Sequence, residues 1–279
     1  MKRIFILLIS FALFANILVA QKYDNDEMRL NFGFSFGKSQ PLLDYGSIKQ
    51  TNLPMGRIYN TGQDTNRISG YAQLGFHYNV YVSYKIKGHL HIKVALNGDI
   101  NSYDLNAISN QYQILFPANT VSVYTPSEYY IMQYLIGPKY NLPVSKNCSI
   151  EFTALAGLIT NNRPPSLTFN RLVDTIIYYY APGRGFGYNV GVGFKYRLQT
   201  NESFAVGFHV NLSYAGSNII YPNYSLTTFT PFATTTYNVP KHMELGILQL
   251  TLGVSLGLLA KKVIDVVSIH SPMPLTQIK

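Results

Sequence analysis

Apolar and polar residues alternate along two adjoining stretches of the chain. From Gly70 to Tyr84 every even-numbered residue is apolar or glycine, and the alternation resumes from Leu90 to Ile100 after a Lys87-Gly88 turn. A period of two is that of a β-strand, in which successive side chains point to opposite faces. These stretches therefore predict a hairpin of two strands, both longer than the ~5–6 residues usual in soluble sheets.

Six further stretches alternate in a similar way. They are Met28–Lys38, Glu128–Leu142, Cys148–Thr160, Gly185–Gln199, Ser203–Gly216 and Glu244–Leu258. Short turns alternate with four long loops, which span Ser39–Ile68, Ser102–Ser127, Asn161–Arg184 and Ser217–Met243. Outer-membrane barrels have short periplasmic turns and long extracellular loops. The sequence therefore predicts an all-β fold, an eight-stranded antiparallel up-and-down transmembrane β-barrel with both ends in the periplasm.

Charged residues distinguish the two faces of these strands. Lys38, Glu128 and Glu244 lie at strand ends. The charged residues inside the strands all lie opposite the apolar face; they are Arg29, Lys85, Lys93, Asp99, Lys139, Glu151, Lys195 and Arg197. A Lys or Arg facing lipid at mid-bilayer costs ~2–4 kcal/mol. The apolar face is therefore predicted to contact outer-membrane lipid, and the charged face to line the lumen. The alternative is a soluble lipocalin-like barrel, whose apolar face would point inward.

The two ends of the chain differ from the strand region. Residues 1–20 combine a basic start with an apolar run that ends at Ala20, which predicts a secretory signal peptide and an outer-membrane location. Residues 21–259 are assigned to the barrel, and residues 260–279 to a periplasmic tail. Within the tail, Val263–Ile269 is β-branched enough to pair with a partner as an edge strand, or it is a frayed end.

Composition agrees with a membrane barrel. The 279 residues include 23 Tyr and 16 Phe, which suits the aromatic girdles of such barrels. No stretch after the signal is long and apolar enough for a spanning helix. The formal charge of +9 is not gathered into a basic tract with interleaved aromatic residues, so nucleic-acid binding is not expected. Outer-membrane lipid and envelope proteins are the expected partners, the latter through the extracellular loops or the tail.

The periplasmic half of the lumen is predicted to hold a network of charges. Its members are Glu151, Lys93, Lys139, Lys195 and Arg197. Because buried charges need partners, Glu151 is expected to pair with Lys93, Lys139 or Arg197. The network is either a structural ion-pair core, or its surplus of positive charge attracts an anion or an acidic segment of a partner.

The extracellular half of the lumen is predicted to be apolar. Its inward residues are Tyr129, Ile131, Leu135, Leu155, Ile159, Leu245 and Ile247, beside a glycine-rich wall on Gly185–Gly193. Two interpretations remain open. The residues line a small pocket for a hydrophobic ligand, or they form a dry plug into which Phe116, Phe229 or Phe232 packs.

No catalytic or cofactor motif is found. The sequence contains no G-x-S-x-G, H-E-x-x-H or phosphate-binding loop. His89 and His91 share one strand face, which is half of a metal site at most, and an ordinary pair at a turn is the simpler interpretation. The chain is therefore expected to be non-enzymatic, with no cofactor and no metal.

The strand pattern, Gln21 after Ala20, and the stretch Ile136–Tyr140 resemble the PorT-like outer-membrane β-barrel domain family. That family is itself similar to the small OmpA-type eight-stranded barrels. The resemblance implies a structural or accessory subunit of a cell-envelope complex, with some members serving protein secretion or assembly. The alternative is a narrow channel or a barrel that binds a small ligand. The tail departs from the family pattern, in which the last strand usually ends the chain with an aromatic residue.

Overall fold

A computed structural model describes the chain over residues 28–48, 68–115, 122–124, 128–162, 167–170, 175–199 and 204–259. The predicted signal peptide, most of the first long loop and the predicted tail lie outside these residues. No helix among the described residues is both long enough and apolar enough to cross a membrane.

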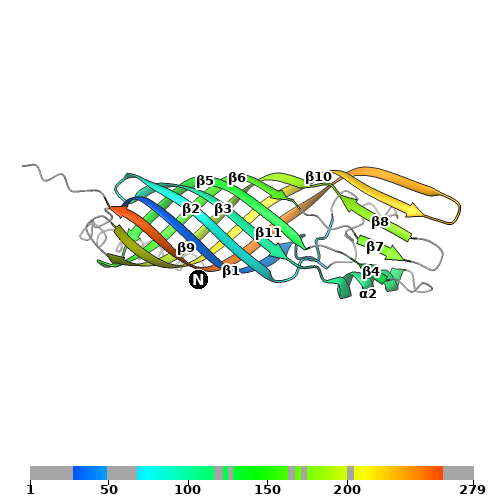
Figure 1. Cartoon of the computed structure of the whole chain (residues 1–279), viewed down its shortest axis with the longest axis horizontal. Helices are drawn as coiled ribbons and strands as arrows, with labels where there is room; N and C mark the ends of the chain where they lie inside the picture. Colours follow the sequence, from blue (N-terminus) through cyan, green and yellow to red (C-terminus); the bar gives the residue numbers. More distant parts are fainter. Residues whose placement is uncertain are drawn as a thin grey trace, which may run out of the picture.

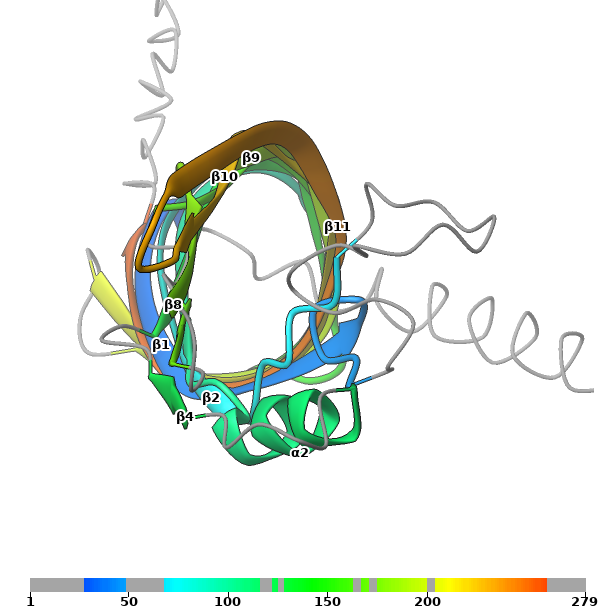
Figure 2. The same ribbon diagram turned by 90° about the vertical axis from the view of Figure 1, so that its right-hand side faces the viewer.

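Eight antiparallel strands close into a barrel (Figures 1 and 2). They are β1 (Met28–Leu43), β2 (Gly75–Lys87), β3 (Leu90–Asn101), β5 (Tyr129–Pro143), β6 (Cys148–Asn161), β9 (Gly183–Gln199), β10 (Phe204–Phe229) and β11 (Thr234–Leu259). Each pairs with the next of these eight strands along the chain, and β11 pairs with β1 to close the ring. The predicted fold class is confirmed.

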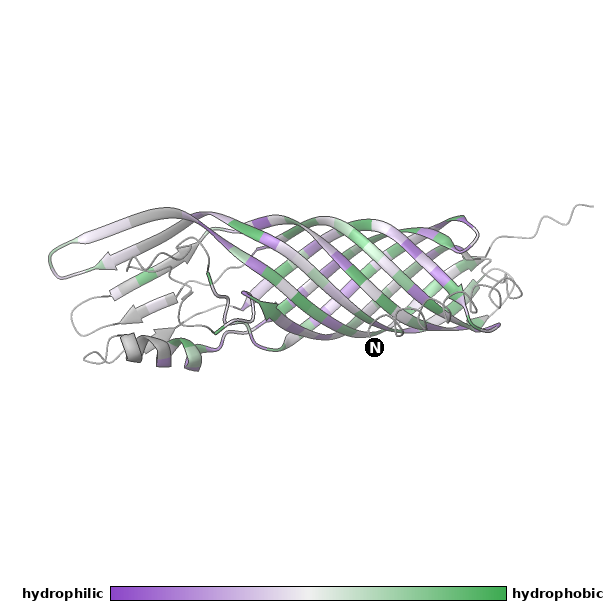
Figure 3. Ribbon diagram, turned by 180° about the vertical axis from the view of Figure 1, so that it is seen from behind, coloured by the Kyte–Doolittle hydropathy of each residue, from purple (hydrophilic) through white to green (hydrophobic). Residues whose placement is uncertain are grey.

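The wall of the barrel has one apolar and one mixed face, and the prediction of the two faces is confirmed. On β1, β2 and β11 the outward residues Phe34, Val80 and Val254 lie side by side and are 45–48% exposed. The alternate residues point inward and are buried, as Tyr81 and Asn97 show at 3% exposure. Figure 3 shows the resulting alternation of colours along each strand. An apolar outer belt on a closed barrel is the surface that lipid requires, since closure leaves no unpaired strand edge in the hydrocarbon.

Several predicted strand boundaries are wrong. β1 continues to Leu43, whereas β2 begins only at Gly75, because the chain turns at Tyr71 with a left-handed φ of 51°. The predicted loop Ser217–Met243 is a continuation of β10 and β11, which are 26 residues each and pair as far as Phe229 and Thr234.

The predicted long loops also hold ordered elements. β8 (Thr175–Tyr180) pairs with the far part of β10, β7 (Leu167–Asn170) pairs with β8, and β4 (Ser122–Tyr124) pairs with β7. The helix α2 (Leu105–Leu115) follows β3. Figure 1 places β4, β7, β8 and α2 beyond one end of the barrel, beside the projecting β10–β11 hairpin. This end carries the long connections, so we call it the extracellular end and the opposite one the periplasmic end.

Candidate functional site

The lumen contains the clusters of buried polar and apolar side chains that the sequence singles out. Because side chains alternate along each strand, every strand contributes one inward row, and an eight-stranded barrel is just narrow enough for these rows to meet. The structure fills the lumen in levels, which we describe from the extracellular end.

The extracellular end is closed by a cluster of aromatic and aliphatic side chains, which we call the tyrosine plug. Its members are Tyr45, Ile68, Tyr71, Ala72, Tyr103, Ile108, Tyr129, Ile131, Ile159, Ala215, Ile219, Tyr221, Met243, Leu245 and Ile247. The ring of Tyr129 packs edge-on against that of Tyr45, with centroids 4.9 Å apart, and lies 4.2 Å from that of Tyr103. Five of the seven predicted apolar lumen residues belong to this plug.

Three hydroxyl groups of the plug, those of Tyr45, Tyr129 and Tyr221, form hydrogen bonds. Tyr45 donates to Asn101 Oδ1 over 3.1 Å, Tyr129 donates to the carbonyl oxygen of Gly70 over 2.9 Å, and Asn161 Nδ2 donates to the Tyr221 hydroxyl over 2.9 Å. Burial raises the pKa of Tyr45 well above its ordinary value, so this phenol stays protonated as a donor.

The residues that fill this end differ from those expected. Phe229 and Phe232 lie on the projecting hairpin, where they are 42% and 96% exposed, so the expectation that they pack into the plug is wrong. Phe116 lies outside the described residues. The loop residues Tyr45, Tyr71 and Tyr103 fill the space instead. The remaining two predicted residues, Leu135 and Leu155, lie apart from the plug in a small cluster with Tyr81 and Ala95.

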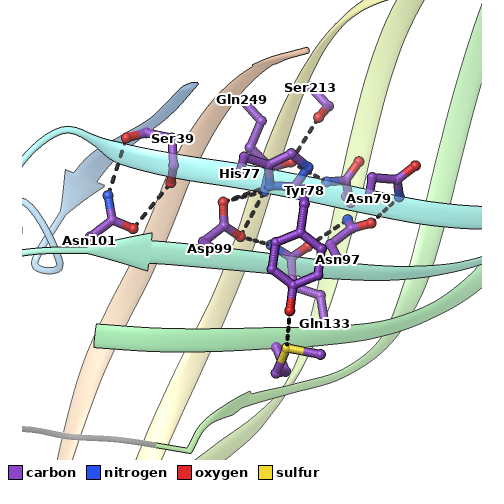
Figure 4. A network of polar contacts seen from close by, with 12 residues as sticks. Ser39, His77, Tyr78, Asn79, Asn97, Asp99, Asn101, Gln133, Ser213 and Gln249 are labelled. Atoms are coloured by element: carbon purple, nitrogen blue, oxygen red, sulfur yellow. Dashed lines mark hydrogen bonds and ion pairs between the residues drawn. The ribbon is translucent and has the colours of Figure 1, made fainter. Parts of the chain in front are cut away.

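Below the plug, a buried carboxylate organises what we call the Asp99 network (Figure 4). Asp99 is fully buried, and its Oδ1 lies 2.8 Å from Nδ1 of His77, the residue opposite it on β2. Gln133 Nε2 donates to Asp99 Oδ2 over 2.7 Å, and Gln249 Nε2 lies 3.1 Å from the same oxygen. Three different strands thus supply the partners of one charge.

A second shell of amides and hydroxyls extends the Asp99 network across the lumen. Asn97 donates to Gln133 over 3.2 Å and accepts from Asn79. Asn189 and Ser213 both donate to Gln249 Oε1 over 2.9 Å. Asp99 lies on the predicted inward face, but the sequence assigned it no partners. The alternation of the sequence does place both His77 and Asp99 on the inward face of the β2–β3 hairpin. They lie directly opposite each other because a bulge between Lys85 and Lys87 shifts the register by one residue.

Nearer the periplasmic end lies what we call the Glu151 cluster, formed by Glu151, Lys93, Lys139, Lys195 and Tyr81. Lys139 Nζ lies 2.7 Å from Glu151 Oε1, and Lys195 Nζ lies 3.9 Å from the same oxygen. Lys93 Nζ lies over the ring of Tyr81, 4.2 Å from its centroid. Tyr81 itself packs over Gly33, where any Cβ would lie only 2.2 Å from the ring.

Arg197 lies outside this cluster. It is at the periplasmic end, where its Nη2 donates to the carbonyl oxygen of Lys146 over 3.2 Å in an exposed position. The structure therefore brings four of the five predicted charges together, with Lys93 joined through Tyr81. His91 is buried near the same end, with Nε2 3.1 Å from Asn141 Nδ2, whereas the His89 ring packs at 6.1 Å from that of Tyr140.

A small polar cavity lies between the Asp99 network and the Glu151 cluster. Its volume is about 30 Å³, enough for about one or two water molecules. Lys93, Glu151, His77 and several Asn, Ser and Thr side chains line it. No group of three or more His, Cys, Asp or Glu side chains within the described ranges is arranged to hold a metal ion.

Comparisons with known proteins give structural similarity alone. No family model and no curated protein sequence matches the chain. Among solved structures, the attachment invasion locus protein Ail of Yersinia pestis matches at 9% identity and a TM-score of 0.35, over 82% of this chain and 99% of that one. A major outer membrane protein of Thermus thermophilus matches at 11% identity and a TM-score of 0.40, over 82% and 98%. OprG of Pseudomonas aeruginosa matches at 9% identity and a TM-score of 0.39, over 82% and 97%.

The assignment of this chain rests on its own strands. Eight strands close into a ring, the outer belt is apolar, and the charges of the barrel strands point inward or lie near either end of the barrel wall, as the exposed Lys38 does opposite Phe76 near the start of β2. These are the properties of a barrel that spans an outer membrane, in which every backbone group pairs within the wall. The protein is a small eight-stranded outer-membrane β-barrel.

Proposed function

We propose that the protein is a non-enzymatic barrel that serves as an accessory subunit of a cell-envelope complex. It presents to a protein partner the β10–β11 hairpin and the strand β8 paired with it, which we call the projecting sheet. One observation carries this proposal. The barrel pairing of β11 with β1 ends at Leu245, yet β10 and β11 stay paired with each other to Phe229 and Thr234. A rigid hairpin therefore projects beyond the membrane barrel.

The chemistry of this projection suits a protein partner. The segment Ser217–Met243 carries one Lys and no Asp, Glu or Arg, and is rich in Thr, Tyr and Asn. Phe232 at its turn is 96% exposed and Ile220 is 53% exposed. Exposed aromatic side chains among uncharged residues are the usual anchors of protein–protein interfaces. β8 stiffens the hairpin from one side by pairing with β10 over six residues.

The closed lumen favours this role over conduction. Tyr45, Ile108, Ile131 and Ile159 in the tyrosine plug are all fully buried, and the Asp99 network crosses the lumen below them. A role in secretion or assembly at the envelope is the one that the PorT-like resemblance implies. Two features support the same role for this chain, namely the projecting β10–β11 hairpin and the filled lumen.

A truncated hairpin tests the proposal. Residues 224–239 are replaced by Asn-Gly, a two-residue turn that suits a hairpin. We expect the variant to keep heat-modifiable migration on gels, because the barrel register is unchanged, and to lose the proteins that co-purify with the wild type in mild detergent. The matched control lengthens the periplasmic turn at Ser145–Asn147 by Gly-Ser and should keep those proteins.

Two outcomes would contradict the proposal. If the truncated variant keeps every co-purifying protein, the projecting sheet is not the docking surface. If the purified wild type conducts ions as a monomer in a planar bilayer, the channel alternative replaces the accessory role.

A further inference from the structure

Positive charge exceeds negative charge in the Glu151 cluster. Three lysines, Lys93, Lys139 and Lys195, gather around a single carboxylate. Glu151 pairs with Lys139 and Lys195, and no carboxylate of the described residues forms an ion pair with Lys93. The described partner of Lys93 Nζ is the face of Tyr81, 4.2 Å away, and a cation–π contact replaces only part of the hydration that an ammonium loses.

The small polar cavity adjoins this lysine. Besides Lys93, its lining includes Ser35 on β1, Asn211 on β10 and Thr251 on β11. Within the part of the chain that the structure describes, these three side chains form no hydrogen bond. Polar groups that a fold leaves uncommitted inside a barrel bind water or an ion, since each would otherwise lose its hydration without replacement.

The two carboxylates near the cavity already have partners. Glu151 is held by Lys139 at 2.7 Å, and Asp99 accepts hydrogen bonds from Gln133 and Gln249 and lies beside His77. The cavity therefore combines one ammonium, two hydroxyl groups and one amide group that can donate, and its lining carboxylate, Glu151, is already paired with Lys139. Donor groups of this kind favour an anion, and the volume of about 30 Å³ restricts it to a small one.

We propose that the lumen cavity binds one small monovalent inorganic anion of the halide class. Lys93 supplies the charge, and Ser35 on β1, Asn211 on β10 and Thr251 on β11 supply hydrogen-bond donors. The anion balances the surplus lysine and fixes the distance between the Asp99 network and the Glu151 cluster. This inference is independent of the proposed accessory function, because it concerns the lumen and not the projecting sheet.

Anomalous diffraction with bromide tests the proposal. Crystals of the full chain grown in sodium bromide are expected to show an anomalous peak in the cavity beside Lys93 Nζ. Lys93→Met, which keeps the length of the side chain and removes its charge, should lose that peak. Lys85→Met removes a lysine from the same sheet at its periplasmic end and should keep the peak. An ordered water with no anomalous signal in the wild type would overturn the proposal, and so would a peak that persists in Lys93→Met.

A solution measurement gives a second readout that does not depend on crystals. In detergent, the midpoint of thermal unfolding should rise with chloride concentration relative to sodium gluconate of equal ionic strength, because gluconate is too large for the cavity. The rise should be present in the wild type and in Lys85→Met and absent in Lys93→Met. Identical midpoints in chloride and gluconate for the wild type would also refute the anion site.

Discussion

The extracellular and periplasmic halves of the lumen are filled by different chemistry. The tyrosine plug consists of aromatic and aliphatic side chains that touch on several sides, and three of its hydroxyl groups form hydrogen bonds. The Asp99 network and the Glu151 cluster consist of charges and amides, each of which needs a partner of the right kind. In the tyrosine plug, a substitution lowers stability mainly through lost contacts and lost volume. In the two polar clusters, replacing a single atom is enough to lower stability, because it leaves a buried polar partner unpaired. Isosteric substitutions distinguish the two.

The largest effect is expected at Glu151. Glu151→Gln keeps the size of the side chain and removes the charge that pairs with Lys139 and Lys195. Leaving buried charges without their partner costs about 3–5 kcal/mol, so urea unfolding in lipid vesicles should shift to a much lower concentration. The double variant Glu151→Met with Lys139→Met should lose less than Glu151→Gln, because both members of the close pair are then apolar. An unchanged unfolding midpoint for Glu151→Gln would show that pairing does not hold this level together.

The next largest effect is expected for a charge on the outer, lipid-facing side of the barrel wall. Val94 faces lipid and is 53% exposed, so Val94→Arg should lower the free energy of unfolding by ~2–4 kcal/mol if the site lies near mid-bilayer. Val94→Leu is the matched apolar control and should leave stability unchanged. Ala95 is unsuitable as an inward control, because it packs with Tyr81 and Leu135 and an arginine would not fit. Equal stability of Val94→Arg and Val94→Leu would argue against lipid contact at this position.

A smaller loss is expected in the Asp99 network. In Asp99→Asn the new amide group offers two donors where Gln133 and Gln249 already donate. Hydrogen bonds to a charged group contribute ~1.5–3 kcal/mol, and we expect a loss in that range in the same unfolding assay. Asp104→Asn is the matched control, since Asp104 accepts from the backbone N–H of Ala107 at the start of α2 and Asn caps helices as well as Asp. Equal losses of stability for the two substitutions would mean that the charge of Asp99 does not stabilise the buried network.

The smallest effect is expected in the tyrosine plug. Tyr45→Phe removes one hydrogen bond to Asn101 and keeps the ring contact with Tyr129, so the loss should be about 0.5–1.5 kcal/mol. Unfolding of this variant in vesicles, compared directly with Glu151→Gln, measures the difference between the two halves of the lumen. If Tyr45→Phe lowers the free energy of unfolding as much as Glu151→Gln does, the two halves of the lumen do not differ in the way proposed here.

Much of the barrel follows from alternation in the sequence, because a strand between lipid and lumen must alternate. The inward and outward residues of β2 and β3 were predicted correctly for this reason. The hairpin beyond Gly216 was missed because Pro222, Pro231 and Pro240 are typical of loops. In the structure Pro222 lies at a bulge, Pro231 lies in the turn, and Pro240 lies in the part of β11 beyond its pairing with β1. Each is a position where a strand tolerates proline.

Other features were missed for want of long-range information. The helix α2 has a local signal in Asp104, which caps its first turn, but it is short. The tyrosines of the plug come from segments that the sequence assigns to loops, and nothing in the local pattern of Tyr45, Tyr71 or Tyr103 indicates that they meet. The pairing of Asp99 with Gln133 and Gln249 joins residues 34 and 150 positions apart, which no single-sequence period can reveal.

The pairing of β1 with β11 has a consequence for how the protein folds. This seam joins Phe34 to Val254 and Leu30 to Leu258, so residues from the two ends of the barrel sequence must meet before the ring closes. Contacts between such distant residues make folding slow, because the entropy of closing a long segment is lost before any seam hydrogen bond forms. The other barrel pairings join consecutive barrel strands. We therefore expect a curled open sheet to form first and the seam to close last, so that insertion waits for synthesis of the whole chain.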